Sequence, residues 1–286
     1  MSVIGAMAGE RQSGRWTLPS FARVGIGGRF GIALFLLLVV LAAAAPLIAG
    51  DPTAPVAAPF ASPSASLPLG TDDIGQDVFS RILFGLRTSL LAATIVIFSG
   101  VLIGGAVGLV AGTRGGRTDA VLMRLTDVFL ALPGPILAIA IVAALGPSLR
   151  NTVLAVALVW WPWYARLMRN EVRALVVRPH IDAAELAGTS TTRIMGRHLL
   201  PGTLPPIVVA ASLDFQVLVL VLAGLSFLGL GSPPPAPELG AMAARGADYL
   251  VGNPLIPLAP GVAVFLIAFA ANLAGDAVRD LMGRRS

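Results

Sequence analysis

Residues 182–201 read DAAELAGTSTTRIMGRHLLP, a polar stretch set inside an otherwise apolar chain. Asp182 is a favourable helix N-cap, and Glu185 stands where a capping box places its acidic residue. Between them, Ala183 and Ala184 favour helix and present little bulk to an approaching protein. The first half of the stretch therefore predicts a short capped helix.

The second half of the same stretch predicts a turn and another helix. Gly188 can leave the first helix through a positive φ. Thr189 or Ser190 can cap the helix that follows, and Pro201 must end it. Together the two halves predict a stiff, bent helix–turn–helix elbow.

The whole chain has the composition of a membrane protein. Of its 286 residues, 56% are hydrophobic and 12% charged, with a mean hydropathy of +0.85. It has no Cys, which excludes disulfides and thiolate metal sites, and His180 and His198 are too few for a His-based metal site. All 20 basic residues are Arg. Because a phosphate-binding loop needs a Lys, this chain is not expected to be an ATPase, and any ATP must be bound elsewhere.

Six apolar runs are candidate membrane spans, at residues 31–49, 88–112, 119–145, 152–168, 204–230 and 255–275. A helix of about 20 residues crosses a hydrocarbon core of about 30 Å. The predicted fold is therefore all-α and polytopic, with about six transmembrane helices. The predicted organisation is a basic tail at 1–30, a first span at 31–49, an outer loop at 50–87, a core of five spans at 88–280 that includes an inner loop at 169–203, and a tail at 281–286.

The arginines give the orientation of these spans. With the N-terminus inside, sixteen of the 20 arginines lie on the inner side and four on the outer side, which is a strong positive-inside bias. Both termini and the elbow are then cytoplasmic. An alternative for residues 1–49 is a cleaved signal peptide, with cleavage near residues 42–45, and it leaves the orientation of the other five helices unchanged.

Two features of the spans suggest a pathway through the bundle. Pro133, Gly134 and Pro135 interrupt the third run, which is tolerable where protein or a wet cavity satisfies the freed backbone groups. They either line a pathway or form a packing kink. Asp214 and Gln216 lie about ten residues inside the fifth run, where a carboxylate faces the bundle interior or water. Asp214 is therefore either a functional residue or a hydrogen-bonded structural one.

Other patterns in the spans indicate packing. The second run carries a glycine at every fourth position, a stripe that favours contact with another helix of this chain over a subunit interface: Gly100, Gly104, Gly108 and Gly112. Arg124 and Asp127 are spaced to form an ion pair. The fourth run ends in aromatic residues that are typical of a membrane-interface belt: Trp160, Trp161, Trp163 and Tyr164.

Outside the membrane, residues 69–81 read LGTDDIGQDVFSR. Ile74, Val78 and Ile82 recur every four residues, and Asp77 can pair with Arg81. The spacing predicts a short amphipathic helix that lies on the outer face.

Five segments in order resemble the C-type permease subunit of dipeptide and oligopeptide ABC importers, which depend on a binding protein. They are LGTDDIGQDVFSR at 69–81, RLTDVFLALPGPILAIA at 124–140, DAAELAG with RHLLP at 182–201, LSFLGLGSPPPAPELGAM at 225–242 and NLAGDAVRD at 272–280. The resemblance extends over most of the chain from Leu69 to Asp280.

The resemblance implies a membrane subunit of a bacterial inner membrane that forms half of a peptide pathway. Its partners would be a paralogous B-type permease, two ATPase subunits or domains that bind ATP and Mg, and an extracytoplasmic binding protein that delivers peptide, with no nucleic acid and no cofactor in this chain. The elbow would be the ATPase-coupling loop, with Asp182, Ala183, Ala184, Glu185, Gly188, His198, Leu200 and Pro201 as its characteristic residues. The outer motif would comprise Gly70, Thr71, Asp72, Gly75, Asp77 and Arg81.

The chain departs from the family pattern at several positions. Asp182 stands where relatives usually carry Glu, which keeps the charge. Gln76 replaces a common Arg, so a charge-based role there is in doubt. Many relatives have an acid at the position of Leu222, whereas the acid on this helix is Asp214. The chain ends in GRRS instead of the usual Leu-Asp-Pro continuation.

Several other functions fit parts of the sequence. The same permease role can serve nickel or another small solute. A proton-coupled secondary transporter could use Asp127 and Asp214, although the two halves show no inverted repeat. Ser226 could be the nucleophile of an intramembrane hydrolase, but both His residues are cytoplasmic, so no Ser–His pair can form. A purely structural membrane scaffold is a further alternative.

Overall fold

The computed structural model describes residues 24–282, so most of the predicted basic tail at 1–30 and the terminal GRRS lie outside the described residues. The described chain is helical throughout its spans, as the sequence predicts. Its elements are α1 (Ile26–Ile48), α2 (Val78–Arg114), α3 (Gly116–Leu130), α4 (Gly134–Leu145), α5 (Leu149–Val176), α6 (Pro179–Leu186), α7 (Thr191–Ile194), the π-helical turn η2 (Met195–Leu199), α8 (Leu200–Phe227), α9 (Leu239–Gly246), the 3-10 turn η3 (Ala247–Tyr249) and α10 (Leu255–Met282).

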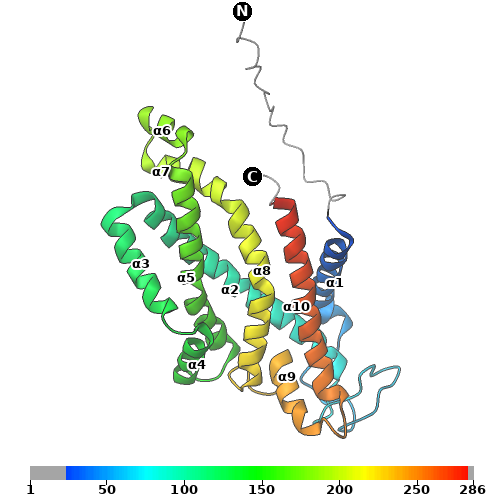
Figure 1. Ribbon diagram of the computed structural model, residues 1–286. Helices are drawn as coiled ribbons and strands as arrows, with labels where there is room; N and C mark the ends of the chain where they lie inside the picture. Colours follow the sequence, from blue (N-terminus) through cyan, green and yellow to red (C-terminus); the bar gives the residue numbers. More distant parts are fainter. Residues whose placement is uncertain (1–23, 283–286) are drawn as a thin grey trace, which may run out of the picture.

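Every predicted apolar run lies largely within a helix or a pair of helices. By length and composition, α1, α2, the continuous helical stretch Thr191–Phe227 and α10 can cross a membrane, and α3 with α4 makes a fifth span if that bent pair is one. The run at 152–168 lies in α5, which has 28 residues but ends in a polar half. The all-α, polytopic class is confirmed, and the chain has the layout of a helical membrane bundle (Figure 1).

The two ends of the bundle carry different elements. Figure 1 shows α6 and α7 at the same end as the start of α1 and the end of α10, whereas α9 and the loop between α1 and α2 lie at the opposite end. The "elbow end" below means the end with α6 and α7, and the "loop end" means the other. The elbow, the start of α1 and the end of α10 therefore lie on one side of the bundle.

The most extensive helix contact joins α2 to α5 and uses the glycine stripe. A Cβ added at Gly104 would lie 2.8 Å from Tyr164 Cβ, and one at Gly112 would lie 2.7 Å from Val172 Cγ1. Glycine therefore lets the two helix backbones approach closely. The interpretation of the stripe as packing within the chain is confirmed.

The close approach of α2 also explains where the aromatic residues lie. Trp161 and Tyr164 are buried against the glycine stripe, and the Trp161 ring meets Phe129 of α3 edge to face at 5.5 Å. Only Trp163 is as exposed as a belt residue should be, at 52%. The belt prediction is therefore wrong for Trp161 and Tyr164, because Tyr164 packs on the glycines of α2 and the Trp161 ring packs against α3.

The predicted break at residues 133–135 is confirmed. The axes of α3 and α4 meet at 79°. Pro133 is the N-cap of α4, and its carbonyl oxygen accepts hydrogen bonds from the N–H groups of Ile136 and Leu137 at 3.0 and 3.1 Å. Gly134 and Pro135 then start α4, since Pro is tolerated in a first helical turn.

The predicted amphipathic helix at 69–81 is wrong. Residues 69–77 form a loop, with φ of +71° at Gly70 and +80° at Gly75, and α2 begins only at Val78. A Cβ at either glycine would overlap a carbonyl oxygen of the 57–61 segment. The four-residue apolar spacing belongs instead to the loop and to the first turns of the membrane-spanning α2.

Candidate functional site

The elbow begins earlier than the sequence predicts. Pro179 is the first residue of α6 and Arg178 its N-cap, so Asp182 lies in the first turn instead of capping the helix. Proline suits this position because the N–H that it lacks has no partner there in any helix. The capping-box prediction is thus wrong, although an acidic side chain in a first turn still interacts favourably with the helix dipole.

Gly188 forms the bend of the elbow. Its φ is +75°, and its N–H donates to the Glu185 carbonyl at 2.9 Å while Thr189 N–H donates to the Ala184 carbonyl at 3.1 Å. No atom lies within 4 Å of where its Cβ would be, so glycine is needed here for its conformation and not for space. Ser190 is the N-cap residue of α7 by its extended backbone, but its side chain makes no capping hydrogen bond.

Pro201 does not end the second arm of the elbow, contrary to the prediction. The N–H of Leu200 donates to the carbonyl of Met195, five residues back, and α8 then continues from Leu200 through Pro201. The π turn changes the hydrogen-bond register just before the residue that cannot donate. The second arm of the elbow and the fifth predicted span therefore form one continuous helical stretch, Thr191–Phe227.

One side of the elbow is anchored in the bundle and the other is exposed. Ile181, Ile194 and Leu199 are each at most 3% exposed and pack in one cluster with Met168 and Val172 of α5 and Ile207 of α8. The opposite side carries exposed Asp182, Ala183 and Glu185 and ends in Leu186, which is 91% exposed. Ala184 is half-buried against the cluster.

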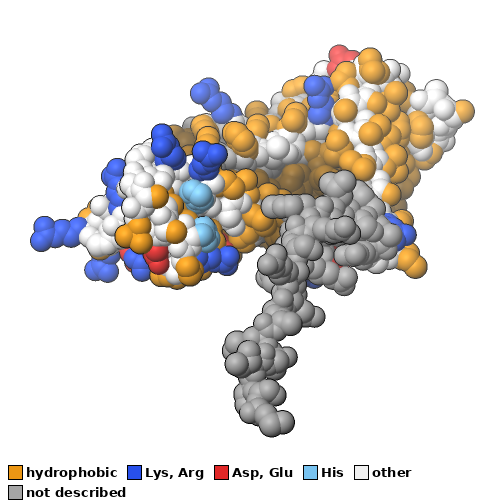
Figure 2. All heavy atoms as spheres, turned by 90° about the horizontal axis from the view of Figure 1, so that it is seen from above, with side chains coloured by type: hydrophobic (Ala, Val, Ile, Leu, Met, Phe, Trp, Pro, Cys, Tyr) orange, Lys and Arg blue, Asp and Glu red, His pale blue; other side chains and the backbone are white. Residues whose placement is uncertain are grey.

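The exposed side of the elbow is rimmed by positive charge. Figure 2, seen from the elbow end, shows Arg side chains around it and the two His side by side. The rings of His180 and His198 lie 6.3 Å apart. Four arginines in the elbow and at the adjacent end of α5 are exposed: Arg173, Arg178, Arg193 and Arg197.

A set of ion pairs lies next to the elbow, and the sequence did not predict it. Asp119 of α3 accepts from Arg169 Nε, from Arg169 Nη2 at 2.7 Å and from Arg173 Nη2 at 2.5 Å, and it is 7% exposed. Asp127 pairs with Arg166 at 2.6 Å, so the predicted pair with Arg124 is wrong. The signal for these contacts was the spacing of the α5 arginines, three and four residues apart, which puts them on one helix face.

At the loop end, Arg81 is the centre of a buried polar cluster that we name the outer clasp: Asp72, Gln76, Arg81 and the carbonyls of Pro52 and Pro235. Arg81 is 1% exposed. Its Nη1 donates to Gln76 Oε1, to Pro52 O at 2.9 Å and to Pro235 O at 3.2 Å, and its Nε lies 3.5 Å from Asp72 Oδ2. The predicted Asp77–Arg81 pair is therefore wrong.

Gln76 has a clear structural use in place of the arginine common in the family. It is 1% exposed, its amide Nε2 donates to Thr53 O at 2.5 Å, and its Oε1 accepts from Arg81. Its backbone N–H donates to Asp72 Oδ1 at 2.8 Å. A neutral amide thus accepts from Arg81 Nη1 and joins the 50–56 segment to α2.

The remaining residues of the outer motif are also structural. Asp77 is the N-cap of α2 and accepts from the N–H groups of Phe79 and Ser80, both at 3.1 Å. The Thr71 hydroxyl donates to Ala58 O at 2.7 Å and accepts from Ala61 N–H at 2.8 Å. These contacts hold the outer loop in one conformation.

Two further contacts fix the loop end. Tyr249 of η3 donates from its hydroxyl to Asp73 Oδ2 at 3.5 Å, and the negative charge of Asp73 raises the pKa of Tyr249. The Ser226 hydroxyl donates to Glu238, which also accepts from Ser232 N–H at 2.6 Å. Ser226 is thus engaged in a structural contact at the end of the bundle opposite both His residues.

In the bundle interior, Asp214 of α8 is half-buried and accepts from Trp160 Nε1 at 3.4 Å. The Tyr164 hydroxyl, one helical turn beyond Trp160 on α5, is buried and makes no hydrogen bond to the described residues. Gln216 is half-buried two residues further along α8. Asp214 therefore sits in a polar site against α5.

The break at 133–135 reaches α5 at the neighbouring position. A Cβ at Gly134 would lie 3.1 Å from Val159 Cγ1, one residue before the Trp160 that binds Asp214. Successive residues of a helix point about 100° apart, so the break and Asp214 lie at one level of α5 but on different sides of it. Within residues 24–282, no group of three or more His, Asp and Glu could hold a metal ion.

Comparison with known proteins gives one consistent result. The family described as "Binding-protein-dependent transport system inner membrane component" matches residues 104–286. The "Probable D,D-dipeptide transport system permease protein DdpC" of Escherichia coli K12 is 41% identical over 88% of this chain and 85% of its own length. The glutathione transport system permease protein GsiD of Pectobacterium atrosepticum is 42% identical over 77% of this chain and 73% of its own.

The comparison extends to another bacterium and to solved structures. The di/tripeptide transport system permease protein DppC of Pseudomonas aeruginosa is 40% identical over 89% of this chain and 87% of its own length. Among solved structures, an inward-facing MetNI methionine ABC transporter superposes with a TM-score of 0.57 at 24% identity, over 71% of this chain and 97% of the matched one. That likeness supports the fold.

Proposed function

The chain belongs to the family of binding-protein-dependent transport system inner membrane components, and from this membership we propose that it is the permease subunit of an ATP-driven importer of peptides. It would form half of a pathway through the bacterial inner membrane and bind no ATP itself. The observation that carries the proposal is the elbow, anchored on one side and exposed on the other.

The elbow is suited to docking on an ATPase subunit at the cytoplasmic face. Its exposed side combines small residues with the apolar tip Leu186, surrounded by arginines. A partner surface can bury Leu186 and pair its acidic residues with the arginines around the elbow. Burial of the apolar tip then gives affinity, and the charge pairs fix the orientation of the partner. ATP and Mg would be bound by that partner, since this chain contains no Lys for a phosphate loop.

Movement of the ATPase would reach the pathway through α8. The second arm of the elbow (α7), the π turn and α8 form one helical stretch, and α8 carries Asp214. A displacement of α7 therefore reaches the pathway helix through continuous helix, and α6 joins α7 through the bend at Gly188. Alternating access would follow from rocking this bundle against a paralogous B-type permease, with a second ATPase subunit or domain below it.

The loop end would receive the extracytoplasmic binding protein. The outer clasp fixes the 50–77 loop against α2 and the 232–238 segment, so this face is preformed. With this orientation, the N- and C-termini are cytoplasmic, which agrees with the distribution of the arginines.

Peptides are the substrate class that we favour over nickel or another small solute. The relatives described above are named for D,D-dipeptide, glutathione and di/tripeptide transport. The test is uptake of labelled dipeptide by cells with and without this gene, with nickel uptake measured in parallel. Loss of nickel uptake with unchanged peptide uptake would refute the substrate assignment.

Cross-linking tests the docking of the elbow. Because the chain has no Cys, each introduced Cys is unique. We expect Leu186→Cys to cross-link to an ATPase subunit in the assembled transporter. Val251→Cys, which is fully exposed at the loop end, is the matched control and should not. Equal cross-linking of both variants, or of neither, would contradict the proposed role of the elbow.

ATP dependence separates this function from a proton-coupled secondary transporter. Uptake by the reconstituted assembly should require ATP and persist when the proton gradient is collapsed. Uptake driven by a proton gradient in the purified chain alone would favour the secondary transporter, with Asp214 as the natural coupling group.

A further inference from the structure

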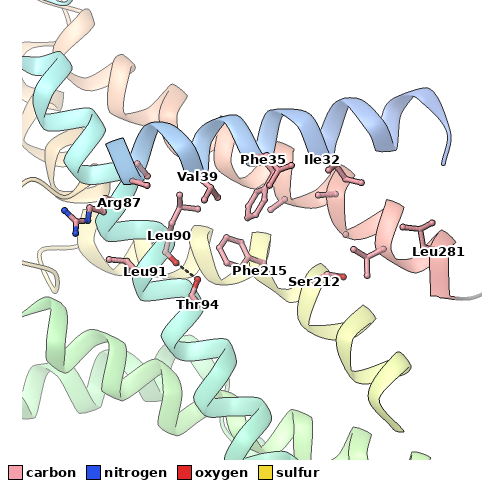
Figure 3. Close-up of a pocket in the computed structure, with 17 residues that line it drawn as sticks. Ile32, Phe35, Val39, Arg87, Leu90, Leu91, Thr94, Ser212, Phe215 and Leu281 are labelled. Atoms are coloured by element: carbon pink, nitrogen blue, oxygen red, sulfur yellow. Dashed lines mark hydrogen bonds between the residues drawn. The ribbon is translucent and has the colours of Figure 1, made fainter. Parts of the chain in front are cut away.

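An apolar cavity of about 750 Å³ lies between α1, α2, α8 and α10, away from the elbow and the outer clasp. All four helices belong to stretches that can cross a membrane, so the cavity lies at membrane depth. Figure 3 shows Phe35 and Val39 of α1, Leu90 of α2 and Phe215 of α8 around it. The rings of Phe35 and Phe215 meet edge to face at 5.3 Å.

The two neutral polar side chains in its wall already make hydrogen bonds within the chain. The Thr94 hydroxyl donates to Leu90 O at 2.7 Å, and the Ser212 hydroxyl donates to Val209 O at 2.8 Å. Neither hydroxyl hydrogen is available to a ligand. A peptide here would leave its own amide groups without partners in an apolar site, which is strongly unfavourable. The cavity therefore does not suit the transported substrate.

Arg87 is the one charged residue in the lining of this cavity. Its side chain is exposed, and no carboxylate among residues 24–282 forms an ion pair with it. Arg87 directly precedes the predicted span at 88–112, at the outer end of the membrane, where phospholipid headgroups lie and long arginine side chains reach them. Arg87 thus lacks an anion that the described part of the chain does not supply.

The position of Arg87 fits a lipid phosphate. In Figure 3 the labelled residues of α1 run from Ile32, near Leu281, to Val39, nearer to Arg87, so Arg87 and Leu281 mark opposite ends of the cavity. From Ile32 to Ala43 the lining of α1 rises about 17 Å at 1.5 Å per residue. An acyl chain anchored at the Arg87 end extends about 15 Å, the depth of one leaflet, along this wall.

We propose that this cavity binds a phospholipid, with an acyl chain along the apolar wall and the phosphate paired with Arg87. A helix of a partner permease is the main competing occupant. A partner helix would cover the apolar wall, but only one with an acidic residue at the level of Arg87 would pair with that arginine. An acyl chain is narrower and matches the lining chemically, and the phosphate supplies the missing anion.

Photolabelling tests the site in the assembled transporter. The full complex is placed in nanodiscs with phosphatidylglycerol that carries a diazirine in one acyl chain, diluted in unlabelled phosphatidylglycerol, and the labelled peptides are mapped after irradiation. We expect label on α1 and α8 around Phe35 and Phe215. Label confined to the outer surfaces of the helices would overturn the proposal.

Two pairs of variants sharpen the result. Arg87→Gln should reduce labelling of the cavity by about tenfold, as for loss of a charge-assisted hydrogen bond. Arg87→Lys should retain most of the labelling. Arg150→Gln, which changes an exposed outer arginine, should leave the labelling unchanged. Ala43→Trp should fill the cavity and abolish labelling, while Ala144→Trp on exposed α4 should not. Assembly of each variant is checked by size-exclusion chromatography.

Each contrary outcome is decisive. Equal labelling of Arg87→Gln and the parent protein would overturn the pairing with phosphate. Cross-linking of Leu36→Cys to the partner permease in place of lipid labelling would assign the cavity to that helix. Both Leu36 and Val39 line the cavity and are exposed, at 56% and 38%, so either occupant is within reach of these probes.

Discussion

The backbone N–H of Leu200 donates to the carbonyl of Met195, five residues back, directly before Pro201. This single π turn lets the second arm of the elbow continue into α8 without a break. The second arm, on the surface, and α8, in the bundle interior, are therefore parts of one continuous helix. The mechanical connection runs through backbone hydrogen bonds and does not depend on a side-chain contact.

We expect Gly188→Val to uncouple ATP hydrolysis from peptide uptake. The φ of +75° is unfavourable for a β-branched residue by about 1–2 kcal/mol, so the bend of the elbow changes while the buried Ile181 and Ile194 keep the protein folded. The measurement is the ratio of ATP hydrolysed to peptide transported. Gly188→Asn is the control, because Asn tolerates this conformation; unchanged coupling in the Val variant would refute the role of the bend.

Asp214→Asn should reduce transport severalfold and leave assembly intact. The amide can still accept from Trp160 Nε1, so only the charge is removed from the polar site on α5. Uptake and the yield of assembled complex are measured together. If assembly is lost instead, Asp214 is a structural residue, which was the alternative left open by the sequence.

Gly104→Ala should destabilise the chain by about 1–3 kcal/mol, because the new Cβ would lie 2.8 Å from Tyr164 Cβ and overlap a backbone carbonyl of α5. Gly105→Ala, on the next position of the same helix, meets only an ordinary 3.4 Å contact with Met168 and serves as the control. Thermal unfolding in detergent compares the two. Equal Tm values would show that the α2–α5 contact is looser than described.

Arg81→Gln should loosen the outer loop. The change removes buried hydrogen bonds to Pro52 O and Pro235 O and leaves Asp72 without its cation, a loss of about 3–5 kcal/mol for a broken buried pair. Limited proteolysis of the 50–77 loop should become much faster. Exposed Arg150→Gln should have no effect, and protease resistance equal to the parent's would contradict the clasp.

The two acidic residues of α3 should differ in their effects. Asp119→Asn removes a 7% exposed carboxylate that binds two arginines, whereas Asp127→Asn removes a pair in which both side chains are about half exposed. We expect a clear drop in Tm for the first and a change within about 1 kcal/mol for the second. Loss of proton-driven uptake in Asp127→Asn would instead support the secondary transporter.

The sequence by itself determined the helical membrane class, the break at 133–135, the positive φ at Gly188 and the use of the glycine stripe. Each of these depends on local chemistry: the length of an apolar run, a missing N–H or a missing Cβ. The family resemblance likewise rested on short segments in order. All of these signals are carried by residues close together in the chain.

Only the tertiary structure decided which charges meet and where helices truly start and end. Asp127 pairs with Arg166 and Arg81 reaches Pro235, partners that are 39 and 154 positions away, because packing of α3 on α5 and of the outer segments on α2 brings them together. Pro201 stays helical because a π turn upstream absorbs its defect. Spacing along one helix could not predict these outcomes, since the competing partners lie on other elements.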